Sequence, residues 1–374
     1  MSVTVYTPAP SRITELDGLR GLAIGLVLWH HMVEFSLPTG REDWLGWLRA
    51  ATNLSWCGVD LFFVLSGYFI GGILLDQRSS VRLVRVFYLR RAVRTLPLYY
   101  VTLLALFASL ALGLTQTTTL FPPWIYALFL TNIALAGHQT WDWLPLSVLW
   151  SLAVEEQFYL TAPWVVRALR PASLPWLLAG LVATALLLRM ICTALFPGNL
   201  FAVHVLMPMR MDALALGALV AWAVREDGMR GFWSRLARCW PHWLVLGLAA
   251  LAGLALVRPI EGGLLLARGG YTLLALVFAL VVAVVAGVRP AGLNRLLAWR
   301  PLALLGRHSY FLYLWHGLLG LGLMRWWGGE HFLLNTFQAL IIVLAASGAT
   351  WLAAGFSWKF FEAPLVRWGQ HHSY

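Results

Sequence analysis

The chain has 374 residues, of which 60% are hydrophobic and only 11% are charged, and its mean hydropathy is +0.74. An ordinary soluble domain carries about 25% charged residues. Repeated apolar runs close to the ~20 residues that cross a bilayer exclude a soluble enzyme, a secreted disulfide scaffold and a disordered chain. We therefore expect an all-α protein, a polytopic bundle of transmembrane helices in the lipid bilayer that forms a single domain over residues 1–374.

The net charge of +11 comes from 27 basic residues, most of which lie in short segments between the apolar runs. Cytoplasmic loops of membrane proteins carry such an excess of Lys and Arg, so this charge favours a membrane orientation and argues against nucleic-acid binding. The three cysteines, Cys57, Cys192 and Cys239, suit neither a disulfide framework nor a metal site. The polar start, residues 1–13, is not followed by a signal-peptide core with a cleavage site, and we expect it to stay on the chain.

Eleven apolar segments are candidate membrane spans, and their number decides on which side each basic cluster lies. Eleven crossings would place the cluster at residues 78–94 and the cluster at residues 225–238 on opposite sides. If one segment between residues 95 and 167 does not cross, both clusters and both termini lie in the cytoplasm. We therefore predict about ten spans and a short cytoplasmic tail at residues 358–374. The eleven segments are 17–37, 54–76, 95–114, 121–137, 147–167, 174–193, 205–224, 242–257, 270–288, 302–324 and 336–357.

The weakest of these segments is 121–137. It is short, opens with Pro122 and Pro123, and contains Asn132. A polar side chain and a proline pair at membrane depth are tolerated where the backbone is buried in protein or lines a cavity. We expect this segment to be re-entrant or interfacial instead of crossing the membrane.

The first segment contains ionisable side chains, which cost at least ~2.5 kcal/mol each at membrane depth and usually serve a function there. Arg20 and His31 are eleven residues apart, which is about three helical turns, so a regular helix places them on one face, ~16 Å apart. His30 would lie about 80° off that face. Glu34 follows His31 by three residues and His30 by four, so it can orient either ring. The alternative is that both histidines are packing residues at the membrane interface.

A second group of ionisable side chains opens the segment at residues 147–167. Glu155 and Tyr159 are four residues apart, so a carboxylate and a phenol point from one helix face, where they can bind a hydroxyl, move a proton or hold backbone in place. The alternative is a capped helix start with solvated carboxylates. For Arg210 and Asp212 we favour an intramembrane ion pair that supports folding. Further candidate site residues are Asp60, Ser66, Ser309, Tyr310 and His316.

Six arginines lie between residues 78 and 94, among them Arg90, Arg91 and Arg94. The positive-inside rule explains such a cluster by orientation alone. The alternative is a phosphate site, because guanidinium groups bind phosphates bidentately. The sequence contains no Walker loop, dinucleotide fingerprint, zinc-ligand spacing or Gly-x-Ser-x-Gly elbow. We therefore expect no metal and no tightly bound cofactor.

Taken in order, these residues resemble the acyltransferase-3 family of bacterial and eukaryotic membrane O-acyltransferases. Each motif is weak alone, but their shared order extends over nearly the whole chain. The similar segments are residues 15–31, 58–70, 91–97, 150–159, 210–214, 309–316 and 361–364. The family's patterns Arg-x10-His, Arg-x-x-Arg and Glu-x-x-x-Tyr fall on Arg20 and His31, on Arg91 and Arg94, and on Glu155 and Tyr159, respectively.

The resemblance implies about ten spans in a bacterial plasma (inner) membrane, with both termini cytoplasmic. It also implies an acyl-CoA co-substrate, usually acetyl-CoA, and a sugar-containing acceptor such as a surface polysaccharide or a glycosylated metabolite. Some family members carry a C-terminal SGNH hydrolase domain, and this chain looks like the form without one. Any second transfer step would then need a separate periplasmic transferase as partner.

On this hypothesis His31 is the general base that takes the proton of the acceptor hydroxyl, and a covalent acyl-histidine is an open variant. Arg91 and Arg94, with the neighbouring Arg90, would hold the donor phosphates, and Arg20 would stabilise negative charge. Glu155 and Tyr159 would position the acceptor or support the site.

Two other function classes stay open from sequence. The first is a proton-coupled transporter or flippase for a glycan or a lipid-linked substrate, in which Arg20, His31 and Glu155 form a proton relay. The second is a membrane scaffold without activity. Consumption of a thioester distinguishes the enzyme from both.

Overall fold

The computed structural model describes residues 13–115, 118–256, 263–329 and 332–374, and every regular element among them is helical. The polar start up to residue 12 lies outside the described residues. Six helices are long and apolar enough to cross a membrane. The all-helical prediction is confirmed, whereas the ten-span count is not established by these six. The six are Trp44–Asp76, Leu83–Ala111, Pro171–Leu195, Leu200–Arg225, Leu266–Val288 and Phe337–Gln370.

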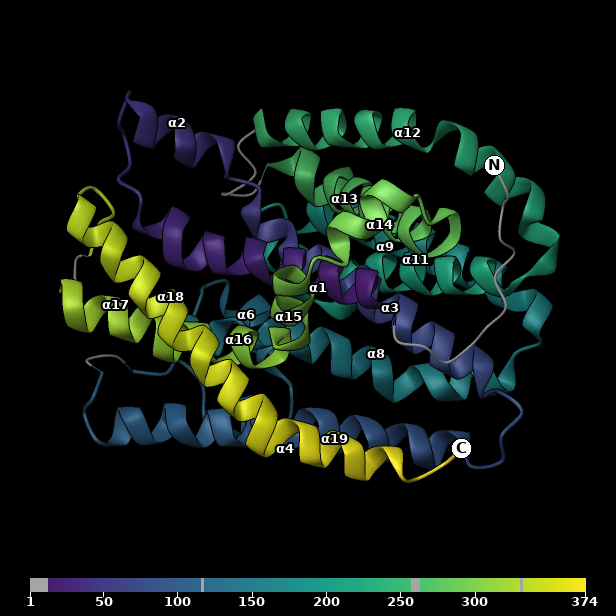
Figure 1. Cartoon of the computed structure of the whole chain (residues 1–374), viewed down its shortest axis with the longest axis horizontal. Helices are drawn as coiled ribbons and strands as arrows, with labels where there is room; N and C mark the ends of the chain where they lie inside the picture. Colours follow the sequence, from purple (N-terminus) through teal and green to yellow (C-terminus); the bar gives the residue numbers. More distant parts are fainter. Residues whose placement is uncertain (1–12, 116–117, 257–262, 330–331) are drawn as a thin grey trace.

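The α-helices follow one another as labelled in Figure 1. They are α1 Thr14–Leu28, α2 Trp44–Ala51, α3 Gly58–Asp76, α4 Leu83–Ala111, α5 Pro123–Ala127, α6 Thr131–His138, α7 Leu144–Ser147, α8 Leu149–Ala168, α9 Leu174–Leu195, α10 Leu200–Val205, α11 Met207–Arg225, α12 Arg230–Leu256, α13 Tyr271–Ala283, α14 Ala291–Leu297, α15 Arg300–Arg307, α16 Ser309–Trp315, α17 Leu321–Gly328, α18 Phe337–Ser357 and α19 Ala363–Gln370. Single π-helical segments adjoin several of them, at Trp29–Val33, Leu266–Gly270, Val284–Val288, His316–Gly320 and Trp358–Glu362.

Helix α1 lies at the centre of the bundle and packs against α3, α15 and α16 (Figure 1). Beside it, α3 and α11 run in close contact because each presents a glycine to the other. A Cβ atom on Gly67 would lie 2.0 Å from the carbonyl oxygen of Leu214, and one on Gly217 would lie 2.0 Å from that of Val64. Small residues at such a crossing let two backbones approach, which is how helices pack tightly where lipid removes the hydrophobic driving force.

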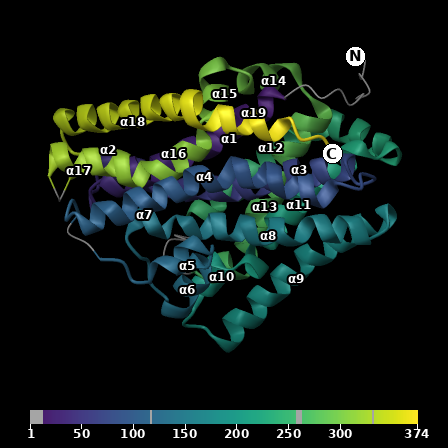
Figure 2. The same cartoon turned by 90° about the horizontal axis from the view of Figure 1, so that it is seen from below.

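The basic connections gather at one end of the bundle. The links α3–α4, α8–α9 and α11–α12 lie together on the right of Figure 2, and the α17–α18 link lies at the opposite end. The first two links contain Arg78, Arg82 and Arg170. Arg225 and Arg230 lie at the two ends of the third link. This grouping is the one that the positive-inside rule predicts for connections on a common side.

Two basic clusters that the sequence suggested as loops are instead helical. Helix α4 begins at Leu83, so Arg85, Arg90, Arg91 and Arg94 lie on a helix that continues to Ala111. Helix α12 likewise begins at Arg230. Arginine is a good helix former, and its long side chain can reach polar surroundings from the end of a helix. A prediction based on the length of apolar runs therefore places the start of these helices too late in the chain.

Two predicted segments are broken. Residues 121–137 form the short helices α5 and α6, separated at Phe129, whose φ is 55°. The segment predicted to be the weakest candidate for a membrane span is thus an interrupted helix. Its position relative to the membrane stays a prediction. The segment 302–324 is divided among α15, α16 and α17.

The predicted tail at residues 358–374 is ordered as part of the bundle. The chain continues from α18 through a π-helical segment, Trp358–Glu362, into α19. Helix α19 packs along α4, as both views show (Figures 1 and 2). This segment therefore helps to form the walls of the bundle.

We expect Gly217→Ala to lower the melting temperature of the purified protein in detergent. The added methyl group meets the backbone of α3, and overpacking of this kind costs about 1–3 kcal/mol. Gly348→Ala is the matched control, because nothing lies within 4 Å of a Cβ at Gly348. Equal melting temperatures for the two variants would contradict the close α3–α11 contact.

Candidate functional site

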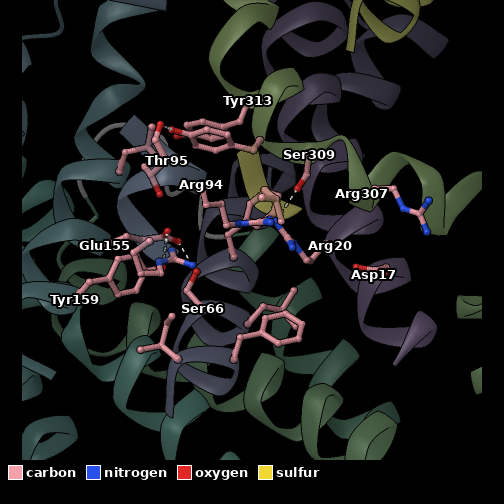
Figure 3. A pocket seen from close by; sticks show the side chains of 18 of the residues that line it. Asp17, Arg20, Ser66, Arg94, Thr95, Glu155, Tyr159, Arg307, Ser309 and Tyr313 are labelled. Atoms are coloured by element: carbon pink, nitrogen blue, oxygen red, sulfur yellow. Dashed lines mark hydrogen bonds between the residues drawn. The ribbon is translucent and has the colours of Figure 1, made fainter. Parts of the chain in front are cut away.

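A cavity of about 880 Å³ opens among α1, α3, α4, α8, α16 and the C-terminal helix (Figure 3). Six of its lining residues are basic and three are acidic, so its interior attracts anions. The basic residues are Arg20, Arg91, Arg94, Arg307, Lys359 and Arg367, and the acidic residues are Asp17, Glu155 and Glu156.

Glu155 is held in place by two hydroxyl groups. Its carboxylate accepts hydrogen bonds from Ser66 Oγ at 2.6 Å and from Tyr159 Oη at 2.8 Å. The guanidinium of Arg91 lies over the Tyr159 ring, 4.2 Å from its centroid, which is a cation–π contact. The structure thus brings Glu155, Tyr159, Ser66 and Arg91 into one wall of the cavity.

Arg20 and Arg94 face this wall with few partners. Arg20 donates one hydrogen bond to the buried Ser309 Oγ, at 3.2 Å, and Arg94 makes no hydrogen bond within the described part of the chain (Figure 3). Arg91 also lies close enough to interact electrostatically with both. Three neighbouring cations repel one another, so an anion that binds among them is stabilised by all three.

Arg90 is oriented differently from Arg91 and Arg94. It donates to the backbone carbonyl oxygens of His372 at 2.7 Å and Gln370 at 3.3 Å, and it stacks on the Tyr374 ring. Burial raises the pKa of the Tyr374 phenol, so this ring is neutral where Arg90 meets it. Arg90 therefore lines a smaller adjoining cavity of about 300 Å³ and anchors the end of the chain on α4.

His31 does not line the large cavity. Its Nδ1 atom lies 3.1 Å from the Val27 carbonyl oxygen and 3.2 Å from Nε2 of His316. Between the cavity and this histidine pair lies Tyr313, which lines the cavity and whose ring centroid is 6.1 Å from that of His316. The Tyr313 hydroxyl is hydrogen-bonded to Ser151 Oγ, another lining residue, at 2.6 Å.

The hydrogen bonds fix the tautomers of both rings. Nδ1 of His316 faces the carbonyl oxygens of Tyr313, at 2.8 Å, and Leu312, at 3.2 Å, which only accept, so Nδ1 of neutral His316 carries the proton. Its Nε2 is then an acceptor for His31 Nδ1–H, which also faces the Val27 carbonyl oxygen. The unprotonated nitrogen of neutral His31 is therefore Nε2.

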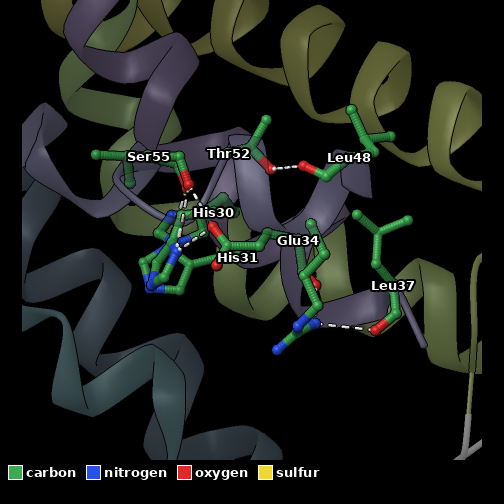
Figure 4. A network of polar contacts seen from close by, with 10 residues as sticks. His30, His31, Glu34, Leu37, Leu48, Thr52 and Ser55 are labelled. Atoms are coloured by element: carbon green, nitrogen blue, oxygen red, sulfur yellow. Dashed lines mark hydrogen bonds and ion pairs between the residues drawn. The ribbon is translucent and has the colours of Figure 1, made fainter. Parts of the chain in front are cut away.

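Glu34 orients His30 and not His31. Its carboxylate lies 2.9 Å from His30 Nδ1 and accepts from Ser55 Oγ at 2.5 Å (Figure 4). Both rings lie on the π-helical segment Trp29–Val33, whose turns hold more than 3.6 residues, so the regular helical spacing does not apply through it. Arg20, on the regular part of α1, lines the cavity, and His31 faces His316.

The acyltransferase domain family matches residues 13–356, which is most of the chain. The chain belongs to the acyltransferase-3 family. The O-acetyltransferase OatA of Staphylococcus aureus is 26% identical over 96% of this chain and 58% of its own length. YrhL of Bacillus subtilis, named as a candidate peptidoglycan O-acetyltransferase, is 30% identical over 81% of this chain and 48% of its own.

The acyltransferase-3 chain thus spans about half the length of the curated relatives it matches. No solved structure matches it. Among the described residues, no group of three or more His, Cys, Asp or Glu side chains is placed to hold a metal ion.

Elsewhere in this acyltransferase-3 bundle, Arg210 and Asp212 are each in an ion pair, but not with each other. Arg210 bonds to Asp60, and Arg189 donates to Asp212 at 2.8 Å. All four side chains are at most 2% exposed. Residues two apart on a helix point in nearly opposite directions, so the predicted pairing within α11 is wrong and each residue bonds to a neighbouring helix.

Three basic residues of the cavity, Arg307, Lys359 and Arg367, were not predicted from the sequence. A signal for the last two was present, since residues 359, 363, 366, 367 and 370 share one face if the helix extends past residue 357. Tyr310, by contrast, was predicted at the site and lines the cavity, where its hydroxyl donates to the Thr95 carbonyl oxygen at 2.7 Å.

We expect Asp60→Ala to destabilise the protein strongly, because it leaves the buried Arg210 charge unpaired, a change that costs about 3–5 kcal/mol. Combining it with Arg210→Met removes the unpaired charge, so the double variant should be more stable than Asp60→Ala alone. Thermal unfolding in detergent measures both, with the exposed Glu42→Ala as control. A double variant no better than the single one would show that the ion pair is not the source of the loss.

Proposed function

We propose that this protein is a membrane O-acyltransferase that moves an acyl group, acetyl in the first instance, from acyl-CoA to a hydroxyl group of a sugar-containing acceptor. The observation that carries the proposal is a cationic cavity that ends one side chain away from a histidine pair. Family membership supports acyl transfer, and the names of OatA and YrhL support acetyl as the group and peptidoglycan as the first acceptor to test.

Arg20, Arg91 and Arg94 would bind the pyrophosphate of the donor. Guanidinium groups bind phosphate oxygens with charge-assisted, often bidentate hydrogen bonds, and these three lie together without carboxylate partners at hydrogen-bond distance among the described residues. Since acyl-CoA is a cytoplasmic metabolite, the basic end of the bundle would face the cytoplasm of a bacterial cell, with both termini on that side. The protein would then lie in the plasma membrane, and a periplasmic partner could receive the product.

The acyl thioester would extend along the cavity to Tyr313 and Ser151. Tyr313 lines the cavity on one side and contacts His316 on the other, so acyl transfer would require Tyr313 to turn aside once the donor is bound. The acceptor would approach His31 from the side of Phe35, which is 51% exposed and whose ring centroid lies 5.5 Å from that of His31.

His31 would act as the general base through Nε2. The proton of the acceptor hydroxyl moves to this nitrogen while the oxygen attacks the thioester carbonyl, the C–O bond forms and the C–S bond breaks. The departing sulfur then takes the proton from the imidazolium, which gives the ester and free CoA and restores neutral His31. His316 would position the base, because its Nε2 accepts from His31 Nδ1–H and keeps the lone pair on the opposite nitrogen.

Glu155 and Tyr159 would support the donor site. They contact Ser66 and Arg91 in the cavity wall, and they are not among the contacts of His31. Of the two roles that the sequence left open, the geometry favours support of the phosphate site over positioning of the acceptor.

The test is release of CoA from acetyl-CoA by the purified protein, with and without peptidoglycan fragments. We expect release that depends on the acceptor and falls by about 10²- to 10⁴-fold in His31→Ala, as for loss of a general base. The exposed His242→Ala is the matched control and should behave as wild type. Transport of a glycan across proteoliposomes without thioester consumption would instead establish a transporter, and full activity of His31→Ala would remove the base assignment.

The positioning role of His316 predicts that two substitutions at this residue lower kcat by different amounts. His316→Leu removes the acceptor that holds the His31 tautomer, so kcat should fall at least tenfold while the KM for acetyl-CoA stays unchanged. His316→Gln places a carbonyl oxygen near the former Nε2 position and should recover part of kcat. Equal losses in both variants, or a rise in KM alone, would contradict a positioning role.

A further inference from the structure

The C-terminal helix, formed by the π-helical segment Trp358–Glu362 and α19, presents both cationic and apolar side chains to the large cavity. Lys359 and Arg367 lie on this face with Ala363, Val366 and Gln370, all of which line the cavity. The two cations thus lie on either side of Ala363 and Val366, about two helical turns apart. Both cationic side chains are exposed, in contrast to the partly buried Arg20, Arg91 and Arg94 deeper in the cavity.

Arg307, at the end of α15, adds a third cation to this outer set. Its Nε atom is buried and has no hydrogen-bond partner among the described residues. The next residue, His308, packs against Trp358 with ring centroids 6.2 Å apart, so the end of α15 lies beside the start of the C-terminal segment. Figure 3 shows Arg307 to one side of the Arg20 and Arg94 pair.

The cavity therefore holds two groups of cations, an inner one of Arg20, Arg91 and Arg94 and an outer one of Arg307, Lys359 and Arg367. A ligand with a single anionic group needs only one of them. Coenzyme A carries two separate anionic groups, a pyrophosphate and a 3′-phosphate on the ribose, with adenine beside the second. Its charge distribution matches two cationic groups with an apolar surface at the outer one.

We propose that Arg307, Lys359 and Arg367 form a subsite for the 3′-phosphate of the acyl-CoA donor, with Ala363 and Val366 beneath the adenine. This inference rests on the proposed function for the identity of the donor, and it adds the residues that select coenzyme A over donors without a 3′-phosphate. A phosphate monoester carries between one and two negative charges at pH 7, so each cation strengthens its binding.

Membrane orientation alone does not explain the arrangement. The positive-inside rule places basic residues at this end of the bundle, but it does not require residues from α15 and the C-terminal helix to line one cavity. Arg295, on α14, is an exposed arginine that does not line the cavity. It provides a matched control for changes in charge.

The experiment compares the binding of coenzyme A and 3′-dephospho-coenzyme A to the full-length protein in detergent, by calorimetry. We expect wild type to bind coenzyme A roughly tenfold to a hundredfold more tightly, as for one charge-assisted phosphate site. Lys359→Gln with Arg367→Gln should weaken binding of coenzyme A and leave dephospho-coenzyme A unchanged, so the preference shrinks to what Arg307 alone supports. Arg295→Gln should keep the wild-type preference.

The outcomes separate this inference from the proposed function. Equal binding of both ligands by wild type, or equal weakening of both by the double variant, would overturn the 3′-phosphate subsite while the donor remains coenzyme A. Absence of binding of either ligand by a folded, monodisperse protein would overturn the donor and, with it, the subsite. Because the readout is binding, it does not depend on finding the acceptor.

Discussion

A positive charge inside a bundle of apolar helices is stable only where a carboxylate, an aromatic ring or a ligand meets it. Arg189 and Arg210 satisfy this constraint within the protein, because each bonds to an aspartate of a neighbouring helix and Arg210 also lies over the Tyr271 ring. Arg20 and Arg94 form no ion pair with a carboxylate among the described residues, and the one hydrogen bond of the two goes from Arg20 to a serine. This difference separates the charges that hold the fold together from those that are available to a substrate.

Helix α1 connects the two chemically distinct parts of the bundle. Its first turns carry Arg20 into the cationic cavity, and its π-helical end carries His30 and His31 to Glu34 and His316. The two parts are therefore rigidly spaced by one helix, while Tyr313 from α16 lies between them. The donor that we propose would thus be directed from its phosphate site towards the histidine pair.

The helical class, the central role of the first segment and the proximity of Glu155 to Tyr159 followed from composition and i, i+4 spacing. The partners of Arg210 and Asp212 did not, since a sequence does not show which helices are neighbours. Glu34 could have oriented either histidine on a regular helix, and the π-helical segment decided the choice. The C-terminal face with Lys359 and Arg367 was missed because an apolar-length criterion ends a helix where its charged residues begin.

The hydrogen bond between Tyr313 and Ser151 also bears on the permeability of the membrane. A polar cavity that opens at one end of a bundle and a histidine cluster towards the other would together form a path for water and protons if nothing lay between them. The Tyr313 ring, with Phe62 packed against it, interrupts that path. On the proposed function, the pantetheine arm of the donor would fill the space that Tyr313 leaves, so an acyl group would pass without a continuous path for water and protons.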